Sequence, residues 1–193
     1  YMEETNFFIR QKDTLVNEDI QLSDYDEMFK ASALKRNWDW RFLASIAYQE
    51  SRYNPNARGF GGAYGMMQFM PNTGPSFNVY PDSPPKIQID AGMRYIDKLY
   101  NSWTNIESTE QRLKFTLASY NAGKGHVEDA VRLAEKNGYN PTIWDDNVEL
   151  MIKLLSDPDY YRNQPVKYGA YRGPAKTYVK AIYSRYMTWR ENE

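Results

Sequence analysis

One carboxylate ends an otherwise apolar helical pattern. Glu50 lies three residues after Ala47 and four after Ile46, so it continues the apolar face of the segment before it. Burial disfavours the charged form of a carboxylate and raises its pKa, which would let Glu50 donate a proton near neutral pH. An alternative remains open, in which Glu50 lies at the domain edge and pairs with Arg52 or Arg58.

A glycine-rich loop without acidic residues follows this carboxylate. It contains Gly65-Met-Met-Gln68, and no Asp or Glu occurs between Glu50 and Asp82. Glycine lets a backbone approach a ligand closely, and a glutamine side chain can both donate and accept hydrogen bonds. The glycine spacing does not match a dinucleotide fingerprint and no Gly-Lys-Ser/Thr follows, so we reject a phosphate-binding loop. A flexible surface loop whose methionines fill the core is the alternative.

A third segment, Ser119-Tyr-Asn-Ala-Gly123, combines a tyrosine with an amide. Tyr120 continues the apolar face of Leu113 and Leu117, so we expect its ring to lie inside and its hydroxyl to need a partner. Asn121 followed by Ala-Gly is typical of a helix C-terminus. The alternative for this segment is an ordinary helix end with no chemical role.

The chain offers little for metal or nucleophile chemistry. His126 is the only histidine and cysteine is absent, so we predict neither a metal site nor a cofactor, and no Ser–His pair. We expect His126 itself to be solvated on a polar helix face.

The composition indicates one folded domain. The chain has 193 residues, 41% of them hydrophobic and 16% aromatic, with a net charge of -1. This charge balance predicts no nucleic-acid partner, and the apolar runs are too short to span a bilayer. Seventeen tyrosines and five tryptophans exceed what a core needs, so some should line a groove, although such rings also suit protein partners.

The periodicity predicts a mainly helical chain without convincing strands. Ser23 and Asn37 are the expected N-caps of the first two helices, and Ser108 with Gln111 forms an expected capping box. We expect helices over about 23–36, 37 to shortly after 50, 85–103, 108–120, 125–136, 141–155 and 174–189. We expect loops over 53–85, with a short helical turn near 66–70, and over 156–173.

Taken together, three motifs carry a family resemblance. Glu50-Ser51, Gly62-Ala-Tyr-Gly-Met-Met-Gln68 and Ser119-Tyr-Asn-Ala-Gly123, in this order and spacing, resemble the lytic transglycosylase catalytic domain of the soluble, family 1 type. The later segments 157–161, 168–173 and 178–179 look most similar to the membrane-bound F type. The resemblance covers roughly residues 24–189.

The sequence departs from the family pattern at three positions. Met66 replaces the usual leucine, and Ser119 replaces the usual alanine. Pro174 stands where many relatives carry a glutamate, four residues before Tyr178. The domain that precedes this module in the F type is absent, and the chain begins with Tyr1. We therefore expect a processed or truncated piece, with residues 1–22 as a linker and 23–193 as the transglycosylase domain.

The resemblance implies a mainly α fold of the lysozyme-like α+β superfamily, a single helical domain with a glycan-binding groove. It implies cleavage of peptidoglycan between N-acetylmuramic acid and N-acetylglucosamine, with Glu50 as the one acid and base and a 1,6-anhydro product. Most glycosidases use two carboxyl groups. No second acid lies near Glu50 in sequence, although Asp145 or Asp146 could fold over the groove.

The resemblance also implies roles for other residues. Ser51 would support Glu50, and the substrate would contact Gly65, Met67, Gln68, Tyr120, Asn121 and Tyr178. The expected partner is the peptidoglycan glycan strand, for a monomer in the periplasm or cell envelope. Membrane association, at the outer membrane, would come only through a missing anchor or upstream region. A hydrolytic muramidase and a non-catalytic peptidoglycan-binding module remain alternatives. Endo or exo action and peptide-stem preference stay open.

Overall fold

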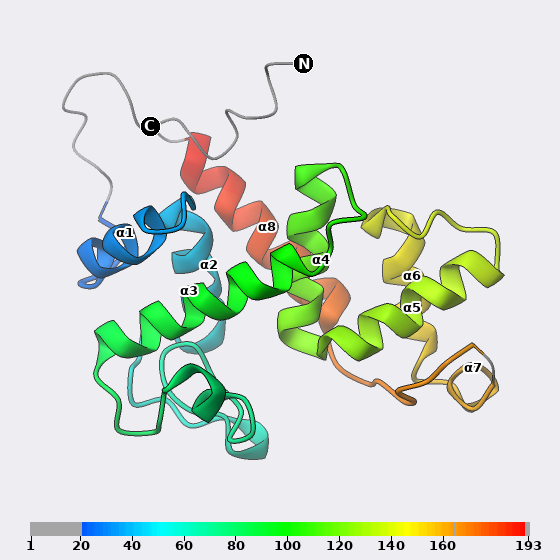
Figure 1. Cartoon of the computed structure of the whole chain (residues 1–193), viewed down its shortest axis with the longest axis horizontal. Coiled ribbons are helices and arrows are strands. Elements are labelled where there is room, and N and C mark those ends of the chain that lie inside the picture. The colour runs from blue at the N-terminus through cyan, green and yellow to red at the C-terminus, as the bar shows by residue number, and fades with distance from the viewer. Residues whose placement is uncertain (1–20, 164, 192–193) are drawn as a thin grey trace. The chain divides into compact units, whose positions relative to one another are not determined.

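The computed structural model describes residues 21–163 and 165–191, and these are mainly helical (Figure 1). The α-helices are α1 (Asp26–Leu34), α2 (Trp40–Ser51), α3 (Pro85–Asn101), α4 (Thr109–Ala122), α5 (Lys124–Lys136), α6 (Glu149–Leu154), α7 (Pro158–Tyr161) and α8 (Ala175–Glu191). Extended pairing within the described ranges is limited to two isolated bridges, Arg58 with Tyr64 and Tyr64 with Phe69. The predicted helical class is confirmed. Most of the expected linker lies outside the described residues.

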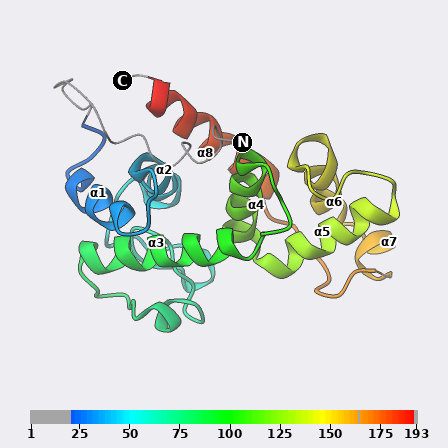
Figure 2. The same ribbon diagram turned by 45° about the horizontal axis from the view of Figure 1, so that its top comes forward.

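The chain divides into two compact units. Among the described residues, unit 1 comprises 21–97 and 182–191, and unit 2 comprises 98–163 and 165–181. In unit 1, α1 packs against α2, while in unit 2, α5 packs against both α4 and α6 (Figure 2). None of the helices within the described ranges is both long enough and apolar enough to span a membrane.

Helix α2 carries the expected apolar stripe, but it begins later than expected. Trp40, Leu43 and Ala47 are all buried, as predicted. The N-cap is Asp39, whose carboxylate accepts a hydrogen bond from Arg41 N at 3.0 Å, so the prediction of Asn37 was wrong. Asn37 instead has φ +56 in the preceding turn. Asparagine tolerates that left-handed conformation, which reverses the chain before the helix starts.

Helix α1 also differs from its prediction at both ends. Its N-cap is Tyr25, which makes no side-chain capping bond, and the helix ends at Leu34, two residues early. The Ser23 hydroxyl does accept a hydrogen bond from Tyr25 N at 3.1 Å and donates to Asp26 at 2.7 Å. Ser23 therefore organises the turn before the helix without being its cap.

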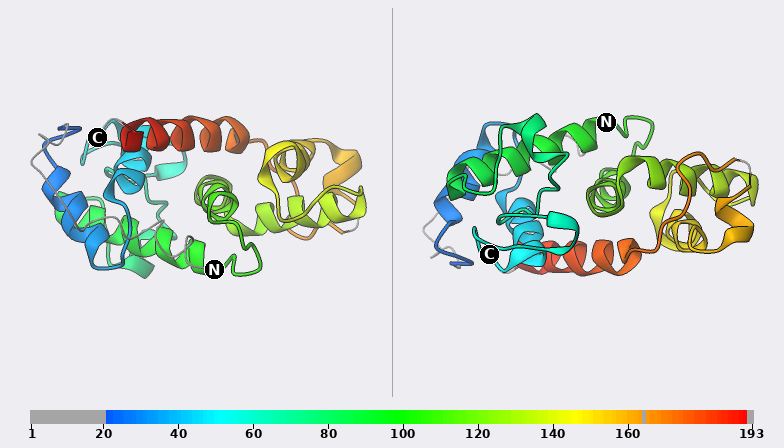
Figure 3. Two further views of the ribbon diagram at one scale, coloured as in Figure 1. Left: turned by 90° about the horizontal axis from the view of Figure 1, so that it is seen from above. Right: turned by 90° about the horizontal axis from the view of Figure 1, so that it is seen from below.

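The loop between α2 and α3 differs from its prediction near the methionines. Residues 65–68 form a tight reverse turn, not a helical turn, because Tyr64 and Phe69 exchange two backbone hydrogen bonds of 3.0 and 2.9 Å. The 3₁₀ turns lie elsewhere in the loop, at Phe60–Gly62 and Gly74–Phe77. Figure 3 shows this loop in cyan to green. These backbone hydrogen bonds give the methionine turn a defined conformation.

In unit 2, α4 begins and ends as predicted. Ser108 is its N-cap, accepting from Gln111 N at 3.4 Å, and Gly123 with φ +82 is its C-cap. The reciprocal half of the capping box is absent. The Gln111 side chain instead accepts from Trp144 N at 2.7 Å and donates to Asp145 at 3.1 Å. A tertiary contact has thus replaced the local one.

The predicted helix over residues 141–155 is shorter than expected. Regular α-helix begins only at Glu149, after a wide turn over Trp144–Val148. Asp145 has ψ 129 and Asp146 has φ 55, so both are non-helical and break the ladder. Just before this break, Trp144 N–H donates to the Gln111 side chain of α4.

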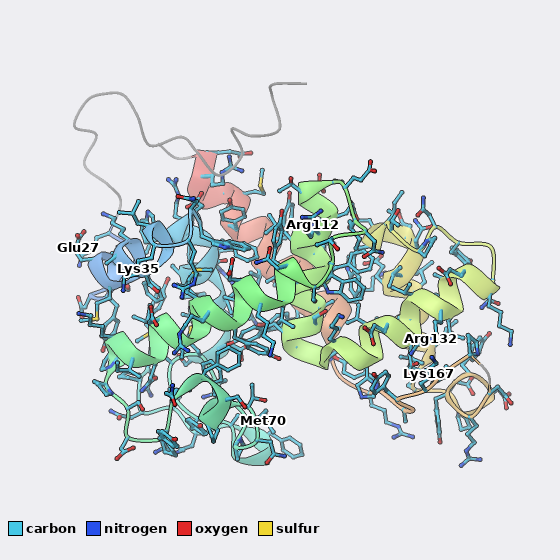
Figure 4. The ribbon with its side chains drawn as sticks, viewed as in Figure 1. Glu27, Lys35, Met70, Arg112, Arg132 and Lys167 are labelled. Atoms are coloured by element: carbon cyan, nitrogen blue, oxygen red, sulfur yellow. The ribbon has the colours of Figure 1, made fainter. Side chains whose placement is uncertain are left out.

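The irregular segment 156–173 is held by one buried carboxylate. Asp129 of α5 is fully buried and accepts 2.7 Å hydrogen bonds from the backbone N–H groups of Lys167 and Tyr168. It also pairs with Arg132, whose Nε donates to Pro165 O at 3.1 Å. Arg132 and Lys167 accordingly lie close together in Figure 4. Asp129 therefore fixes a loop that lacks regular structure of its own.

We expect Asp129→Asn to destabilise the protein by about 3 kcal/mol, because the amide replaces an acceptor by a donor and leaves Arg132 without its buried partner. The measurement is the free energy of unfolding in urea. Asp159→Asn, at an exposed position of α7, is the matched control and should change it by less than about 0.5 kcal/mol. Equal stability of the two variants would contradict this account of the loop.

Candidate active site

Glu50 is the second-last residue of α2, and its side chain is half-buried. The helix ends one residue later because Arg52 adopts the left-handed conformation with φ 54, which confirms the predicted stop before Pro55. Both arginines proposed as alternative partners for Glu50 engage other groups. The Arg52 guanidinium lies 3.9 Å from the Tyr48 ring centre, and Arg58 donates to two backbone carbonyls.

Ser51 joins the end of α2 to the glycine-rich turn. Its hydroxyl donates to Met66 O at 2.8 Å, and Ala47 O lies 3.4 Å from the same hydroxyl. The first contact spans fifteen residues of sequence and links Glu50-Ser51 to the Gly65–Gln68 turn. Two of the three motifs therefore form one structure within unit 1.

The turn itself depends on Gly65. This residue has φ +78, and a Cβ atom there would lie 2.5 Å from Oε1 of Gln88. Its N–H donates to Ala57 O at 2.9 Å, while its carbonyl accepts from Gln68 Nε2 at 2.8 Å. Glycine is needed here for both conformation and space. The Gln68 amide group thus closes its own turn, and Gln68 also has a positive φ of 48.

Sequence reasoning missed Gln88, which supports the turn from α3. It is 2% exposed, and its Oε1 accepts from Met66 N at 2.6 Å. Its Nε2 donates to Pro55 O at 3.1 Å and to Ser83 O at 2.6 Å. The available signal was a polar residue one helical turn before the small residues Ala91 and Gly92, on the face that α3 buries. Gln88 therefore satisfies three backbone groups that no regular element pairs.

The methionines of the turn are core residues. Met66 and Met67 are both fully buried, and a Cβ atom at Gly92 of α3 would lie 2.7 Å from the Met67 methyl group. This agrees with the reading in which the methionines fill the core. The sequence did not single out Met70, which is 45% exposed. The groove contact assigned to Met67 stays a prediction.

The third motif is organised by two side-chain hydrogen bonds within unit 2. Trp103 Nε1 donates to the buried Ser119 hydroxyl at 3.0 Å, so this serine satisfies an indole N–H. Asn121 Oδ1 accepts a 2.8 Å hydrogen bond from the Tyr171 hydroxyl. Tyr120 is half-buried, whereas Leu117, three residues earlier in α4, is fully buried. Tyr171 is the second residue that sequence reasoning did not assign a role.

Three other predicted residues of unit 2 have defined surroundings. Tyr178 lies in the first half of α8 and is 6% exposed. His126 is not simply solvated as expected. Its ring packs 5.5 Å from that of Tyr171, and its Nδ1 atom is buried without a hydrogen-bond partner. The Asp145 carboxylate is held by Lys114 Nζ at 2.5 Å and by Gln111.

The electrostatics of Asp145 indicate a structural ion pair. Burial opposes its ionisation, but the hydrogen bonds from Lys114 and Gln111 outweigh burial and lower the pKa of Asp145. That Asp145 or Asp146 acts as a second carboxylate beside Glu50 stays a prediction. Within the described ranges, no group of three or more His, Cys, Asp or Glu side chains is arranged to hold a metal ion.

The comparisons with known proteins agree with these motifs. The chain belongs to the transglycosylase SLT domain family, whose match covers residues 27–143. It is 36% identical over 175 residues to membrane-bound lytic murein transglycosylase F of Aeromonas salmonicida, covering 89% of this chain and 34% of that protein. For the protein of the same name in Shewanella loihica the identity is 40% over 158 residues, covering 80% and 33%. The family resemblance noted in the sequence is confirmed, and the chain spans about a third of the length of these relatives.

Solved structures show the same fold. The 70 kDa soluble lytic transglycosylase SLT70 from Escherichia coli matches with a TM-score of 0.59 at 23% identity, over 87% of this chain and 24% of that chain. An inactive mutant of lytic transglycosylase Slt from Pseudomonas aeruginosa matches with a TM-score of 0.57 at 19% identity, over 90% and 25%.

We expect Gln88→Leu to destabilise the protein by about 3 kcal/mol, because it leaves the buried Met66 N–H and the half-buried carbonyls of Pro55 and Ser83 without this partner. Urea unfolding measures the loss. Lys86→Leu introduces the same side chain at an exposed position in the same turn of α3, so it should leave stability within about 0.5 kcal/mol. If both variants unfold at the same urea concentration as the parent, Gln88 does not support the turn.

Proposed function

We propose that this chain is the catalytic part of a peptidoglycan lytic transglycosylase. It would cleave the β-1,4 bond between N-acetylmuramic acid and N-acetylglucosamine and leave 1,6-anhydro ends. The observation that carries the proposal is the 2.8 Å hydrogen bond from Ser51 to Met66 O, which ties the helix end bearing Glu50 to the Gly65–Gln68 turn. The family membership and the names of the relatives, which are lytic murein transglycosylases, support the same reaction.

In the proposed mechanism Glu50 acts twice. Its carboxylic acid first protonates the glycosidic oxygen, so that the N-acetylglucosamine portion leaves as an alcohol. The neighbouring acetamido oxygen of the muramoyl residue stabilises the positive charge that develops at C1. The Glu50 carboxylate then takes the proton from the C6 hydroxyl, whose oxygen bonds to C1. Glu50 gives up one proton and takes back one, so no water is consumed and the carboxylic acid is restored.

The half-buried position of Glu50 at a helix C-terminus suits this role. Helix C-termini carry partial negative charge, and partial burial removes solvent, so both effects favour the protonated acid that the first step needs. The predicted raised pKa of Glu50 is part of the proposal. Ser51 would act by holding the helix end against the turn.

We propose that the substrate contacts the residues that the motifs indicate. Backbone groups at Gly65 and the amides of Gln68 and Asn121 would bind acetamido or hydroxyl groups of the glycan. Tyr120 would bring its hydroxyl near the scissile sugar, and the groove wall would include Met67 and Tyr178. We propose a monomer that acts on glycan strands in the periplasm or cell envelope, and outer-membrane association would come through segments outside this chain.

The decisive variant is Glu50→Gln, which keeps the shape of the side chain but cannot donate and retrieve a proton. We expect it to release no muropeptides from purified sacculi, a loss of at least about a thousandfold, while its melting temperature and sacculus binding stay unchanged. Glu27→Gln, an exposed carboxylate of α1, is the matched control and should retain full turnover.

Mass spectrometry of the products separates the remaining possibilities. Anhydro ends are lighter by one water than reducing ends, so a hydrolytic muramidase would show itself directly. Full activity of Glu50→Gln would remove Glu50 from the mechanism. Binding of sacculi without any release by the parent protein would indicate a non-catalytic module.

A further inference from the structure

The Tyr171 hydroxyl links the third motif to the start of α8. It donates to Asn121 Oδ1 at 2.8 Å and accepts from Ala175 N at 3.1 Å. Ala175 is the first residue of α8, so its N–H has no partner within the helix. The hydroxyl thus links Asn121, which lies fifty residues earlier in the sequence, to a backbone N–H group that needs an acceptor.

The directions of these hydrogen bonds determine the orientation of the Asn121 amide. A phenolic hydroxyl has one proton, and a backbone N–H can only donate. Because Ala175 N–H donates to the phenolic oxygen, the hydroxyl proton is available for Asn121, which must present Oδ1 to receive it. In the reverse orientation, Asn121 Nδ2 and Ala175 N–H would both donate to the phenolic oxygen. The hydroxyl proton of Tyr171 would then lose Asn121 Oδ1 as its acceptor. The Nδ2 group of Asn121 is consequently the end that faces away from Tyr171.

The surroundings hold Tyr171 in the position that this network needs. Its backbone N–H donates to Leu155 O at 3.0 Å, and its ring packs against His126 with ring centres 5.5 Å apart. A Cβ atom at Gly173 would lie 2.4 Å from the Tyr171 hydroxyl oxygen, so only glycine leaves room there. Burial raises the pKa of Tyr171, which keeps the hydroxyl protonated as a donor at neutral pH.

We propose that Tyr171 is a positioning residue that fixes the Asn121 carboxamide so that its Nδ2 amino group is presented as a hydrogen-bond donor to an oxygen of the glycan. The favoured acceptor is a carbonyl oxygen, as in an acetamido group, because a carbonyl cannot donate to a wrongly turned amide. A freely turning amide would present Oδ1 or Nδ2 and lose this selectivity. The inference rests on the proposed function only through the identity of the ligand.

The test uses the Glu50→Gln protein, which should bind glycan without consuming it. The dissociation constant for purified soluble glycan strands is measured with and without Tyr171→Phe. Removal of the hydroxyl should weaken binding about three- to tenfold, the effect of one net hydrogen bond. Tyr139→Phe, an exposed tyrosine of the same unit, is the matched control and should leave the dissociation constant unchanged. Melting temperatures of all variants show that each is folded at the measuring temperature.

A double-mutant cycle distinguishes positioning from a general structural effect. If Tyr171 acts through Asn121, then Tyr171→Phe should have no further effect on binding in the Asn121→Ala background. An equal loss in both backgrounds, or no loss in the parent background, would overturn the proposal.

The nuclear magnetic resonance signals of the Asn121 side-chain amide report its orientation without any ligand. They should shift in Tyr171→Phe and stay unchanged in Tyr139→Phe, and unchanged signals in both would also overturn the proposal. A protein that binds no glycan strand, yet shows the expected amide shift, would contradict the proposed function and leave the Tyr171–Asn121 arrangement standing.

Discussion

The Gly65–Gln68 turn must have its backbone polar groups satisfied without a sheet or a helix to pair them. Three side chains meet this need: Ser51 donates to Met66 O, Gln88 accepts from Met66 N, and Gln68 donates to Gly65 O. Unpaired buried backbone groups are costly, so these contacts restrict the turn to one conformation. The end of α2, and with it Glu50, is positioned by the same contacts. The rest of the candidate site in unit 1 depends on this arrangement.

In unit 2, different side chains satisfy the backbone polar groups of another irregular segment. The segment from Pro165 to Gly173 has little regular structure, yet Asp129 accepts two of its backbone N–H groups and Leu155 O accepts a third, from Tyr171. The Tyr171 hydroxyl then reaches Asn121 at the end of α4. In both units, a few buried or half-buried polar side chains satisfy the backbone groups of an irregular segment and so order it. Apolar packing, as of Phe115 against Trp144, supplies the frame around them.

Local patterns predicted much of the helical framework. Apolar spacing placed the buried stripe of α2, and Ser108 and Gly123 marked the ends of α4 correctly. One error has a tertiary cause, because a side chain expected to act locally found a distant partner. Gln111 was expected to close its own capping box, but its side chain binds Trp144 and Asp145, which lie just before α6. Sequence spacing cannot reveal such a choice, since both partners satisfy the same amide.

The sequence by itself determined the helical class, the family and the identity of the motifs, because periodicity and motif order are properties of the chain alone. It also indicated Glu50, since a carboxylate on an apolar helical face is visible in the spacing. Only the tertiary structure decided which side chains support those motifs. Gln88 and Tyr171 are separated by 22 and 50 residues from the groups they hold, Met66 N and Asn121 Oδ1. Hydrogen bonds over such separations depend on how the helices pack, and no local pattern encodes them.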